Sequence, residues 1–306
     1  VTASSGPGIA LKGEAIGLAI MLEIPLLIIN VQRGGPSTGL PTKTEQSDLM
    51  QAMYGRNGEA PLAIVAASSP SDCFEAIYEA ARITVEHMTP VIFLSDGFIA
   101  NGSEPWKFPK SSELTPINAR FANKEKSMKD GTFYPYKRNS DLVREWAIPG
   151  TEGLTHRVGG LEKENETGNV SYDPANHELM VNIRQEKVDL IAHDIPNQEM
   201  TQGETSGKVL VLGWGSTYGA IRTAVRELIG DGHSVSHAHI RYLNPFPKNL
   251  GDLLSAFDTI VVPEINNGQL VHIINAKYGV GAIGVNKIQG LPYTAREIKE
   301  RILELM

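Results

Sequence analysis

The sequence predicts an α/β fold with two open parallel sheets, each covered by helices and joined by a long irregular excursion. Apolar runs without polar alternation recur in the first and the last third of the chain, and segments with helical periodicity separate them. Between these parts, roughly from residue 107 to 207, the chain is rich in Pro, Gly, Asn and charge. The length of 306 residues agrees with about two domains.

The first third alternates strands and helices. Ser69 is predicted to cap a helix that has Pro70 in its first position, and Asp72 would complete a capping box. Apolar side chains at helical spacing continue this helix toward Met88. The other expected elements are a helix ending near Leu22, a strand over 25–31, a polar helix over 45–54, and strands over 62–68 and 90–96.

The excursion and the last third complete the expected architecture. A short hairpin around 168–172 and a helix over 177–195 are expected in the excursion, and Thr294 with Glu297 is predicted to cap the final helix. Strands are expected over 208–215, 234–243 and 258–265, with helices after each of them. We expect domains over 1–115 and 207–306, with the excursion over 116–206 between them.

Composition excludes several classes of function. With Cys73 as the single cysteine, the chain can form no internal disulfide, iron–sulfur cluster or cysteine-based zinc site, and a free thiol is typical of the cytoplasm. The net charge of −7 argues against nucleic-acid binding and against a basic membrane-binding patch. Glu23 and Pro25 interrupt the most apolar stretch, so no membrane span is predicted. The chain begins at Val1 without Met, and we expect it to be a piece of a longer polypeptide.

Several short motifs favour a structural interpretation. Ser37 lies in a G-x-S-x-G match, but five residues separate it from the preceding strand and Pro41 obstructs a following helix, which argues against a hydrolase nucleophile. The glycines at 213, 215 and 219 are more typical of a tight strand-to-helix connection than of dinucleotide binding. Gly230-Asp231-Gly232 is interpreted as the end of a helix, and His237 and His239 as part of a polar strand face rather than a metal site. For Cys73 we expect packing rather than a lowered pKa. Core or interface roles are expected for Trp106, Trp146 and Trp214.

Two polar loops rich in Gly and Pro offer the strongest candidate site. They span 2–8 and 32–42, and the second follows a buried strand at its carboxyl end, where open parallel sheets bind ligands. Arg33 is a permanent cation whose two-pronged donors suit a carboxylate, and Thr38 and Thr42 add hydroxyls nearby. The residues alone thus predict an anion pocket. The alternative is a structural loop in which Arg33 pairs with an internal Asp or Glu.

These segments resemble a known family. "TASSGPG", a helix and "IPLLIINVQR" are similar to the pyrimidine-binding domain of thiamine diphosphate enzymes. "QRGGPSTGLPTKTEQSDLMQAMYGRNGEAP" resembles the alpha subunit of 2-oxoacid:ferredoxin oxidoreductases, on the 2-oxoglutarate branch. "LSDGF", "DPANHELMVNIRQEKV" and "YLNPFP" extend the resemblance nearly to the end of the chain, and the second domain is similar to the transketolase C-terminal domain.

The resemblance implies an enzyme that oxidises 2-oxoglutarate to succinyl-CoA, or runs the reverse carboxylation, with coenzyme A and ferredoxin as further reactants. It implies thiamine diphosphate and Mg shared with a beta subunit, a [4Fe–4S] cluster in that partner, and an (αβ)2 assembly. Arg33 matches the arginine that binds the substrate carboxylate, Thr42 matches a threonine implicated in 2-oxoacid recognition, and Thr38 adds a hydroxyl beside them. The residues placed near the cofactor are Ser5, Gly6, Pro7, Gly8, Asp96, Gly97 and Phe98.

Other interpretations stay open at this stage. The same family includes enzymes acting on pyruvate or branched-chain 2-oxoacids. In the family, the glutamate that activates the aminopyrimidine precedes "TASSGPG" and is outside these residues, so we assign no catalytic residue to the chain and expect it to be inactive alone. A non-catalytic scaffolding subunit and a serine hydrolase built on Ser37 are the alternatives from other classes.

Overall fold

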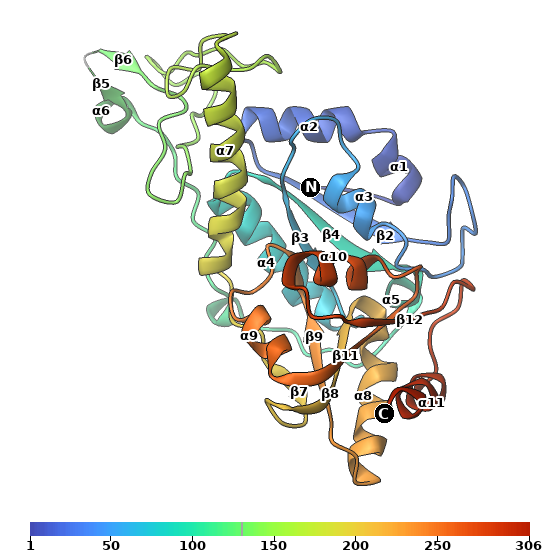
Figure 1. Ribbon diagram of the computed structural model, residues 1–306. Helices are drawn as coiled ribbons and strands as arrows, with labels where there is room; N and C mark the ends of the chain where they lie inside the picture. Colours follow the sequence, from blue (N-terminus) through green and yellow to red (C-terminus); the bar gives the residue numbers. More distant parts are fainter. Residues whose placement is uncertain (130) are drawn as a thin grey trace.

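Two five-stranded sheets form the framework of the computed structural model, which describes residues 1–129 and 131–306 (Figure 1). The strands of the first sheet are, in spatial order, β1 (Thr2–Ser4), β2 (Leu26–Gln32), β4 (Pro90–Asp96), β3 (Ala63–Ala66) and β10 (Tyr242–Asn244). Those of the second are β12 (Ile283–Asn286), β11 (Phe257–Glu264), β8 (Gly207–Trp214), β9 (Val235–Ile240) and β7 (Met200–Gln202). All neighbours are parallel except the edge strands β10 and β7. The predicted parallel-sheet α/β fold is confirmed.

Helices cover both sheets. In the first part they are α1 (Gly6–Ala10), α2 (Gly13–Leu22), α3 (Leu49–Tyr54), α4 (Asp72–Glu86) and α5 (Gly97–Asn101). The excursion contains η1 (Ser111–Glu113), α6 (Lys124–Ser127), a small hairpin of β5 (Met128–Lys129) and β6 (Thr132–Phe133), α7 (Pro174–Leu190) and η2 (Ile191–His193). The last part has η3 (Gly215–Thr217), α8 (Tyr218–Gly230), α9 (Leu250–Ser255), α10 (Gln269–Tyr278) and α11 (Ala295–Leu305).

A single hydrophobic core connects the two sheets. It combines buried side chains of α1, α2, α3 and the first sheet with those of α9, α10 and the second sheet, among them Leu49, Leu212 and Leu270. The outer face of the first sheet packs on α4, and the outer face of the second packs on α8 and α11 (Figure 1). Because the sheets share their inner helical layer, their relative position is set by packing rather than by a linker. The domain limits proposed from sequence stay a prediction.

Buried charges attach the excursion to the first part of the chain. Glu23, which is 1% exposed, forms ion pairs with Arg138 and Lys187. Burial would raise the pKa of Glu23, but the charges of Lys187 and Arg138 and their hydrogen bonds lower it to about 2. Arg144 donates to the carbonyls of Leu22 and Glu23, each over 3.1 Å. The end of α2 is thereby bound to two distant segments of the excursion.

Several elements differ from the sequence-based expectation. The single strand expected over 234–243 is wrong: it divides at Arg241 into β9 and β10, which belong to different sheets, because the Arg241 carbonyl accepts a hydrogen bond from Ala66 N of β3 over 2.8 Å. The hairpin expected around 168–172 is reduced to one bridge between Lys163 and Val170. The short strands β1, β7 and β12 were not predicted from the sequence, because three or four residues are too few to show a pattern of apolar side chains typical of a strand.

Some helix ends agree with the expectation and others shift: the helix expected over 177–195 is α7, from Pro174 to Leu190, and the one expected over 45–54 begins at Leu49. Thr294 and Glu297 form the predicted capping box of α11. The helix assigned to Pro70 begins at Asp72 instead, although the Ser69 hydroxyl accepts from Asp72 N over 3.3 Å, as the predicted cap requires. Asp231 follows the last residue of α8, as expected for a helix end there.

Candidate functional site

The two candidate loops and the turn after β4 lie at one edge of the first sheet. β1, β2 and β4 are parallel neighbours, with Ser4 opposite Asn30 and Gln32 opposite Asp96. The segments that follow these strands therefore leave the sheet at its carboxyl edge, side by side. Ser5–Gly8, Arg33 and Asp96–Phe98 come from these three segments. Sequence placed them in one site, and the structure brings them to one edge.

Arg33 is half-buried and forms no ion pair with a described carboxylate, although its charge acts on the nearby Asp48. Its Nε is buried without a hydrogen bond, and no ion pair joins its guanidinium to any described Asp or Glu. The loop is held instead through the Arg33 carbonyl, which accepts from Ser47 Oγ over 2.8 Å. The described residues therefore do not support the alternative in which Arg33 forms an ion pair with an internal Asp or Glu. Its donors remain available to an external anion.

Asp48 was not singled out from sequence, although it lies at the centre of this edge. Its carboxylate accepts from Asn30 Nδ2 over 3.1 Å and from Ser47 Oγ over 3.2 Å, and its N–H donates to Gln32 Oε1 over 3.0 Å. A Cβ on Gly6 would lie 2.6 Å from Asp48 Oδ2, so glycine permits this close approach. Burial raises the pKa of Asp48, although the hydrogen bonds from Asn30 and Ser47 and the charge of Arg33 act to lower it.

Polar residues in strand β2 are the signal that could have found Asp48. Asn30 and Gln32 interrupt an otherwise apolar strand, and each is 1% exposed. A buried amide needs partners, so two of them at the end of one strand predict a polar group beyond it. The Gln32 side chain reaches Ser95 O over 3.1 Å as well as the Asp48 N–H, and so links β4 to the loop.

The Asp96 side chain caps the helix that follows it, α5. Its side chain, 1% exposed, accepts from Phe98 N over 2.9 Å and from Ile99 N over 3.1 Å, and so caps α5. Burial raises the pKa of Asp96, while these N–H groups oppose the shift. Phe98 is 49% exposed and presents its ring to the surface. The Asp96–Phe98 turn therefore offers an aromatic face rather than a free carboxylate.

Thr38 and Thr42 lie on an exposed loop that closes on itself. The Leu40 N–H donates to Gly34 O over 2.8 Å, and Gly34 N–H donates to Lys43 O over 3.0 Å. Neither threonine hydroxyl contacts Arg33 among the described hydrogen bonds, so their roles in substrate binding stay a prediction. Ser37 is exposed on the same loop, and the next helix, α3, begins only at Leu49. The geometry of a hydrolase nucleophile, on a sharp turn between strand and helix, is absent there.

Gln46 attaches this loop to the second sheet. Its side chain is fully buried and donates to Trp214 O over 2.8 Å, while its Oε1 accepts from Ile265 N over 2.9 Å. Its backbone N–H donates to Ile265 O over 2.9 Å, and its carbonyl accepts from Asn266 Nδ2 over 2.8 Å. Four hydrogen bonds thus connect one residue to the carboxyl ends of β8 and β11. The candidate site is positioned by both sheets.

Glu264 supports the same junction from within the second sheet. It is fully buried and accepts from Trp214 Nε1, Asn266 Nδ2 and the N–H groups of Leu270 and Val271 over 2.8–3.2 Å. Burial raises its pKa against these four donors. Gly215 has φ +59°, and a Cβ there would meet Gln46 Nε2 at 2.6 Å. Gly215 is therefore explained by a tight connection between β8 and the helix that follows it.

Other candidate residues have structural surroundings. His237 and His239 lie on one face of β9, where His237 is buried and His239 is partly exposed; burial lowers both pKa values, that of His239 to about 4. Cys73 packs beside the outer core of the first sheet, and burial raises its pKa to about 11, which confirms the packing interpretation. Trp214 is fully buried, whereas Trp106 is 39% exposed. No group of three or more potential metal ligands occurs among the described residues.

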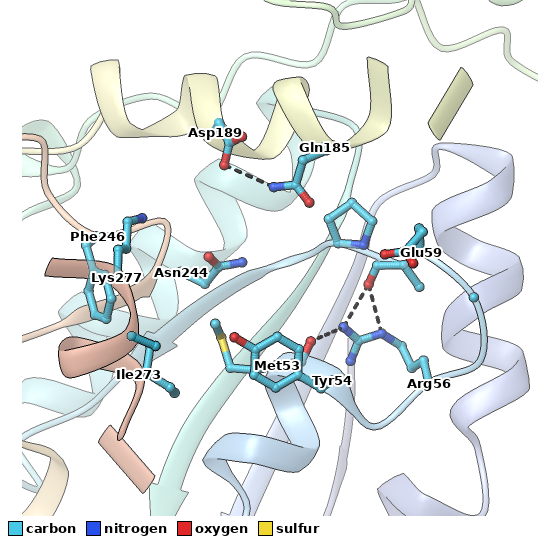
Figure 2. A pocket seen from close by; sticks show the side chains of 14 residues that line it. Met53, Tyr54, Arg56, Glu59, Gln185, Asp189, Asn244, Phe246, Ile273 and Lys277 are labelled. Atoms are coloured by element: carbon cyan, nitrogen blue, oxygen red, sulfur yellow. Dashed lines mark hydrogen bonds between the residues drawn. The ribbon is translucent and has the colours of Figure 1, made fainter. Parts of the chain in front are cut away.

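A separate cavity of about 450 Å³ opens between α3, α7, α10 and β10 (Figure 2). Its most prominent group is the Arg56 guanidinium, which donates to the carbonyls of Ala52, Met53 and Ala60 over 2.7–3.0 Å. Burial lowers the pKa of Arg56 to about 10. Since its donors are used by backbone carbonyls, this arginine stabilises the loop after α3 and is not free for a ligand.

Comparison with known proteins finds similarity to subunits of 2-oxoacid oxidoreductases. The family model described as "Pyruvate flavodoxin/ferredoxin oxidoreductase, thiamine diP-bdg" matches residues 1–173. The 2-oxoglutarate oxidoreductase subunit KorA of Mycobacterium tuberculosis (strain ATCC 25618 / H37Rv) is 53% identical over 299 residues, which are 97% of this chain and 45% of that protein. The 2-oxoglutarate synthase subunit KorA of Methanothermobacter marburgensis is 30% identical over 300 residues, 97% of this chain and 76% of that protein. The chain spans about half the length of several curated relatives that it matches.

Solved structures agree with the fold. The 2-oxoglutarate:ferredoxin oxidoreductase from Magnetococcus marinus, with 2-oxoglutarate, coenzyme A and succinyl-CoA bound, superposes with a TM-score of 0.91 at 36% identity, covering 99% of this chain and 52% of that one. An inactive tetramer of a split-gene transketolase superposes with a TM-score of 0.50 at 12% identity, covering 99% of this chain and 74% of that one. The second likeness concerns the fold alone. No helix among the described residues is both long and apolar enough to cross a bilayer.

Proposed function

The chain belongs to the pyruvate flavodoxin/ferredoxin oxidoreductase family, thiamine diphosphate-binding, and on that premise we propose that it binds the 2-oxoacid in a 2-oxoglutarate:ferredoxin oxidoreductase. Arg33 carries this proposal, because its guanidinium reaches the carboxyl edge of the sheet without a carboxylate of its own. The identities of 53% and 30% to proteins named for 2-oxoglutarate support that substrate. Pyruvate and branched-chain 2-oxoacids remain the alternative substrates.

The residues at this edge fit one side of a thiamine diphosphate site. The buried, unpaired Nε of Arg33 leaves a donor for a ligand, while Phe98 provides an aromatic surface. We assign Ser5, Gly6, Pro7 and Gly8 with Asp96, Gly97 and Phe98 to this wall. When bound, thiamine diphosphate supplies the carbon nucleophile that decarboxylation of a 2-oxoacid requires.

The chain's own groups bind and orient the substrate in this proposal. Arg33 forms a charge-assisted, two-pronged contact with the substrate carboxylate, and Asp48 lies close enough for its charge to act on Arg33. Thr38 and Thr42 provide hydroxyls for the rest of the 2-oxoacid once the loop closes on it. Gln46 holds the loop against the second sheet, which keeps Arg33 in register with the edge.

The remaining components are assigned to partners. We propose that a beta subunit completes the cofactor site, holds Mg and the diphosphate, and carries the [4Fe–4S] cluster that passes electrons to ferredoxin. Cys73 alone could not ligate such a cluster. An (αβ)2 assembly in the cytoplasm, with coenzyme A accepting the acyl group, completes the proposal.

The test uses the full-length protein purified with its partner. Coenzyme A-dependent viologen reduction is measured with 2-oxoglutarate, pyruvate and 2-oxoisovalerate, for the unchanged enzyme, Arg33→Ala and Arg296→Ala. Arg33→Ala should raise KM for 2-oxoglutarate at least about tenfold, since a charged hydrogen-bonding partner is lost. The exposed Arg296 on α11 serves as the control and should leave KM unchanged.

Each outcome has a definite meaning. Preference for another 2-oxoacid would keep the family and change the substrate. An unchanged KM in Arg33→Ala would remove Arg33 from the site. Absence of activity with all three acids would favour a scaffolding subunit.

A further inference from the structure

A second cleft lies between the carboxyl ends of both sheets, away from Arg33. It has a volume of about 900 Å³ and is bounded on one side by α8, on the other by the start of α4, and at its mouth by the 104–107 segment. Its floor includes Ala66 at the end of β3 and His239 and Ile240 at the end of β9. This is the edge at which open α/β sheets bind ligands, and the cleft is large enough for a nucleotide.

One wall of the cleft carries unpaired cations. Arg222 and Arg226 are one helical turn apart on α8 and both line the cleft, as does Lys107 from the opposite mouth. None of the three forms an ion pair or hydrogen bond with another described residue. Arg241, by contrast, is already paired with Asp72. Two free guanidinium groups at this spacing suit the two phosphates of a diphosphate.

The N-terminal turn of α8 lines the same wall. No side chain caps η3 or α8, because the Thr217 hydroxyl donates backward to Trp214 O over 2.7 Å. Ser216 is 6% exposed and lines the cleft, and its hydroxyl faces the buried carboxylate of Asp96, whose pKa it acts to lower. The start of this helix therefore adds only its dipole to the two arginines, and the dipole favours an anion.

The opposite wall differs in charge and is already satisfied. The start of α4 is closed by Glu104, which accepts from Ser71 N over 2.6 Å, and by Asp72, which accepts from Ser68 N over 2.8 Å. Glu75 lines this wall without an ion pair. Its carboxylate would repel phosphate but can accept hydrogen bonds from ribose hydroxyls. Trp106, 39% exposed, gives the same region an aromatic surface.

We propose that this cleft binds a nucleoside diphosphate. The diphosphate lies along α8 against Arg222, Arg226 and the Ser216 end of the helix, the ribose hydroxyls donate to Glu75, and the base rests on Trp106. One wall of the cleft is basic and the other is acidic, and this difference favours a nucleotide over inorganic phosphate. Inorganic phosphate would bind the arginines and leave Glu75 without a hydrogen-bond donor. The proposal does not depend on the function assigned to the Arg33 edge, because it concerns other residues.

The test measures equilibrium binding to the full-length protein purified with its partner. The probes are ADP, inorganic pyrophosphate and coenzyme A, which carries the same adenosine 5′-diphosphate. The Arg222→Ala/Arg226→Ala variant should weaken ADP and pyrophosphate at least about tenfold, and rising ionic strength should weaken both further. Glu75→Gln should weaken ADP severalfold and leave pyrophosphate unaffected. Arg296→Ala on the exposed face of α11 is the matched control.

The outcomes separate the sources of the ligand. Competition between ADP and coenzyme A, lost in the double arginine variant, would show that the coenzyme's nucleotide uses the cleft. ADP binding without such competition would indicate a free nucleotide. Failure of ADP to bind, or binding unchanged in the double arginine variant whose thermal stability is intact, would overturn the proposal.

Discussion

Replacing Gln46 with Met tests the connection between the site and the second sheet. The two side chains are similar in length and volume, so the change removes hydrogen bonds with little change in packing. Gln46 is fully buried, and its side chain bonds Trp214 O and Ile265 N over 2.8 and 2.9 Å. The backbone hydrogen bonds of Gln46 to Ile265 and Asn266 do not depend on the side chain and should persist.

The two lost bonds differ in cost. Ile265 N–H would be left buried without an acceptor, which costs about 1–3 kcal/mol. Trp214 O keeps the Thr217 hydroxyl at 2.7 Å, so the loss there is only the net value of one hydrogen bond, about 1 kcal/mol. The free energy of unfolding should therefore fall by about 2–4 kcal/mol. The loop that carries Arg33 would also be less firmly held, so KM for the 2-oxoacid should rise.

Urea denaturation of the full-length protein, at constant slope, measures the first effect, and steady-state kinetics measure the second. Gln185→Met is the matched control, because the Gln185 amide is exposed and bonds only Asp189 over 3.0 Å. The control should lose no more than about 0.5 kcal/mol. Equal losses in the two variants would refute the role assigned to Gln46, as would an unchanged stability of Gln46→Met.

Three further predictions concern buried ionisable groups. Glu23→Gln should lower the free energy of unfolding, measured by urea denaturation, by about 3–5 kcal/mol, because buried Arg138 and Lys187 lose their carboxylate. Glu152→Gln, which breaks an exposed ion pair, should lower it by at most about 1 kcal/mol. Similar losses in the two variants would contradict the role assigned to Glu23. Burial lowers the pKa of His239 to about 4, so the unfolded chain takes up a proton first and stability should fall as pH drops from about 6.5 toward 4, by up to about 1.4 kcal/mol per unit. His239→Gln should reduce this dependence without abolishing it, because the pKa of the neighbouring His237 is also lowered. The exposed His193→Gln should leave it unchanged; an equally steep dependence in His239→Gln and in the unchanged protein would refute the prediction. With its pKa raised to about 11, Cys73 should react with iodoacetamide at pH 8 roughly 100-fold more slowly in native protein than in urea, as followed by peptide mass spectrometry; equal rates would count against burial of the thiol.

Much of the fold follows from local sequence patterns. Residues 26–32 and 90–96 are continuous apolar runs with polar residues only at their ends, and such runs read as buried parallel strands. Thr294 and Glu297 cap α11 through contacts three residues apart, which sequence spacing encodes directly. The carboxyl-edge position of Arg33 follows from the same reasoning, because it comes directly after a strand.

Local sequence patterns do not predict polar contacts between residues that are far apart in the chain. Gln46 and Trp214 are 168 positions apart, and nothing in the local sequence of either indicates the other. Asp48 is likewise defined by the backbone at Gly6 and the amide of Asn30, which belong to separate segments. The division of the expected strand at Arg241 depends on which sheet offers a free edge, a property of the assembled sheets rather than of the residues in the strand.

The position of β10 has a consequence for the order in which the protein is made. The first sheet receives four strands from residues before 97, but its last strand lies at Tyr242–Asn244, after most of the second sheet has been synthesised. During translation, β3 therefore emerges from the ribosome with an unpaired edge. That edge stays unpaired until about 175 further residues, from Ala66 to Tyr242, have been added, which takes roughly 10–35 seconds at usual elongation rates. Asn244 then closes the sheet through its amide, which donates to Leu62 O over 2.6 Å. Nascent chains halted before residue 242 should be the ones that recruit chaperones.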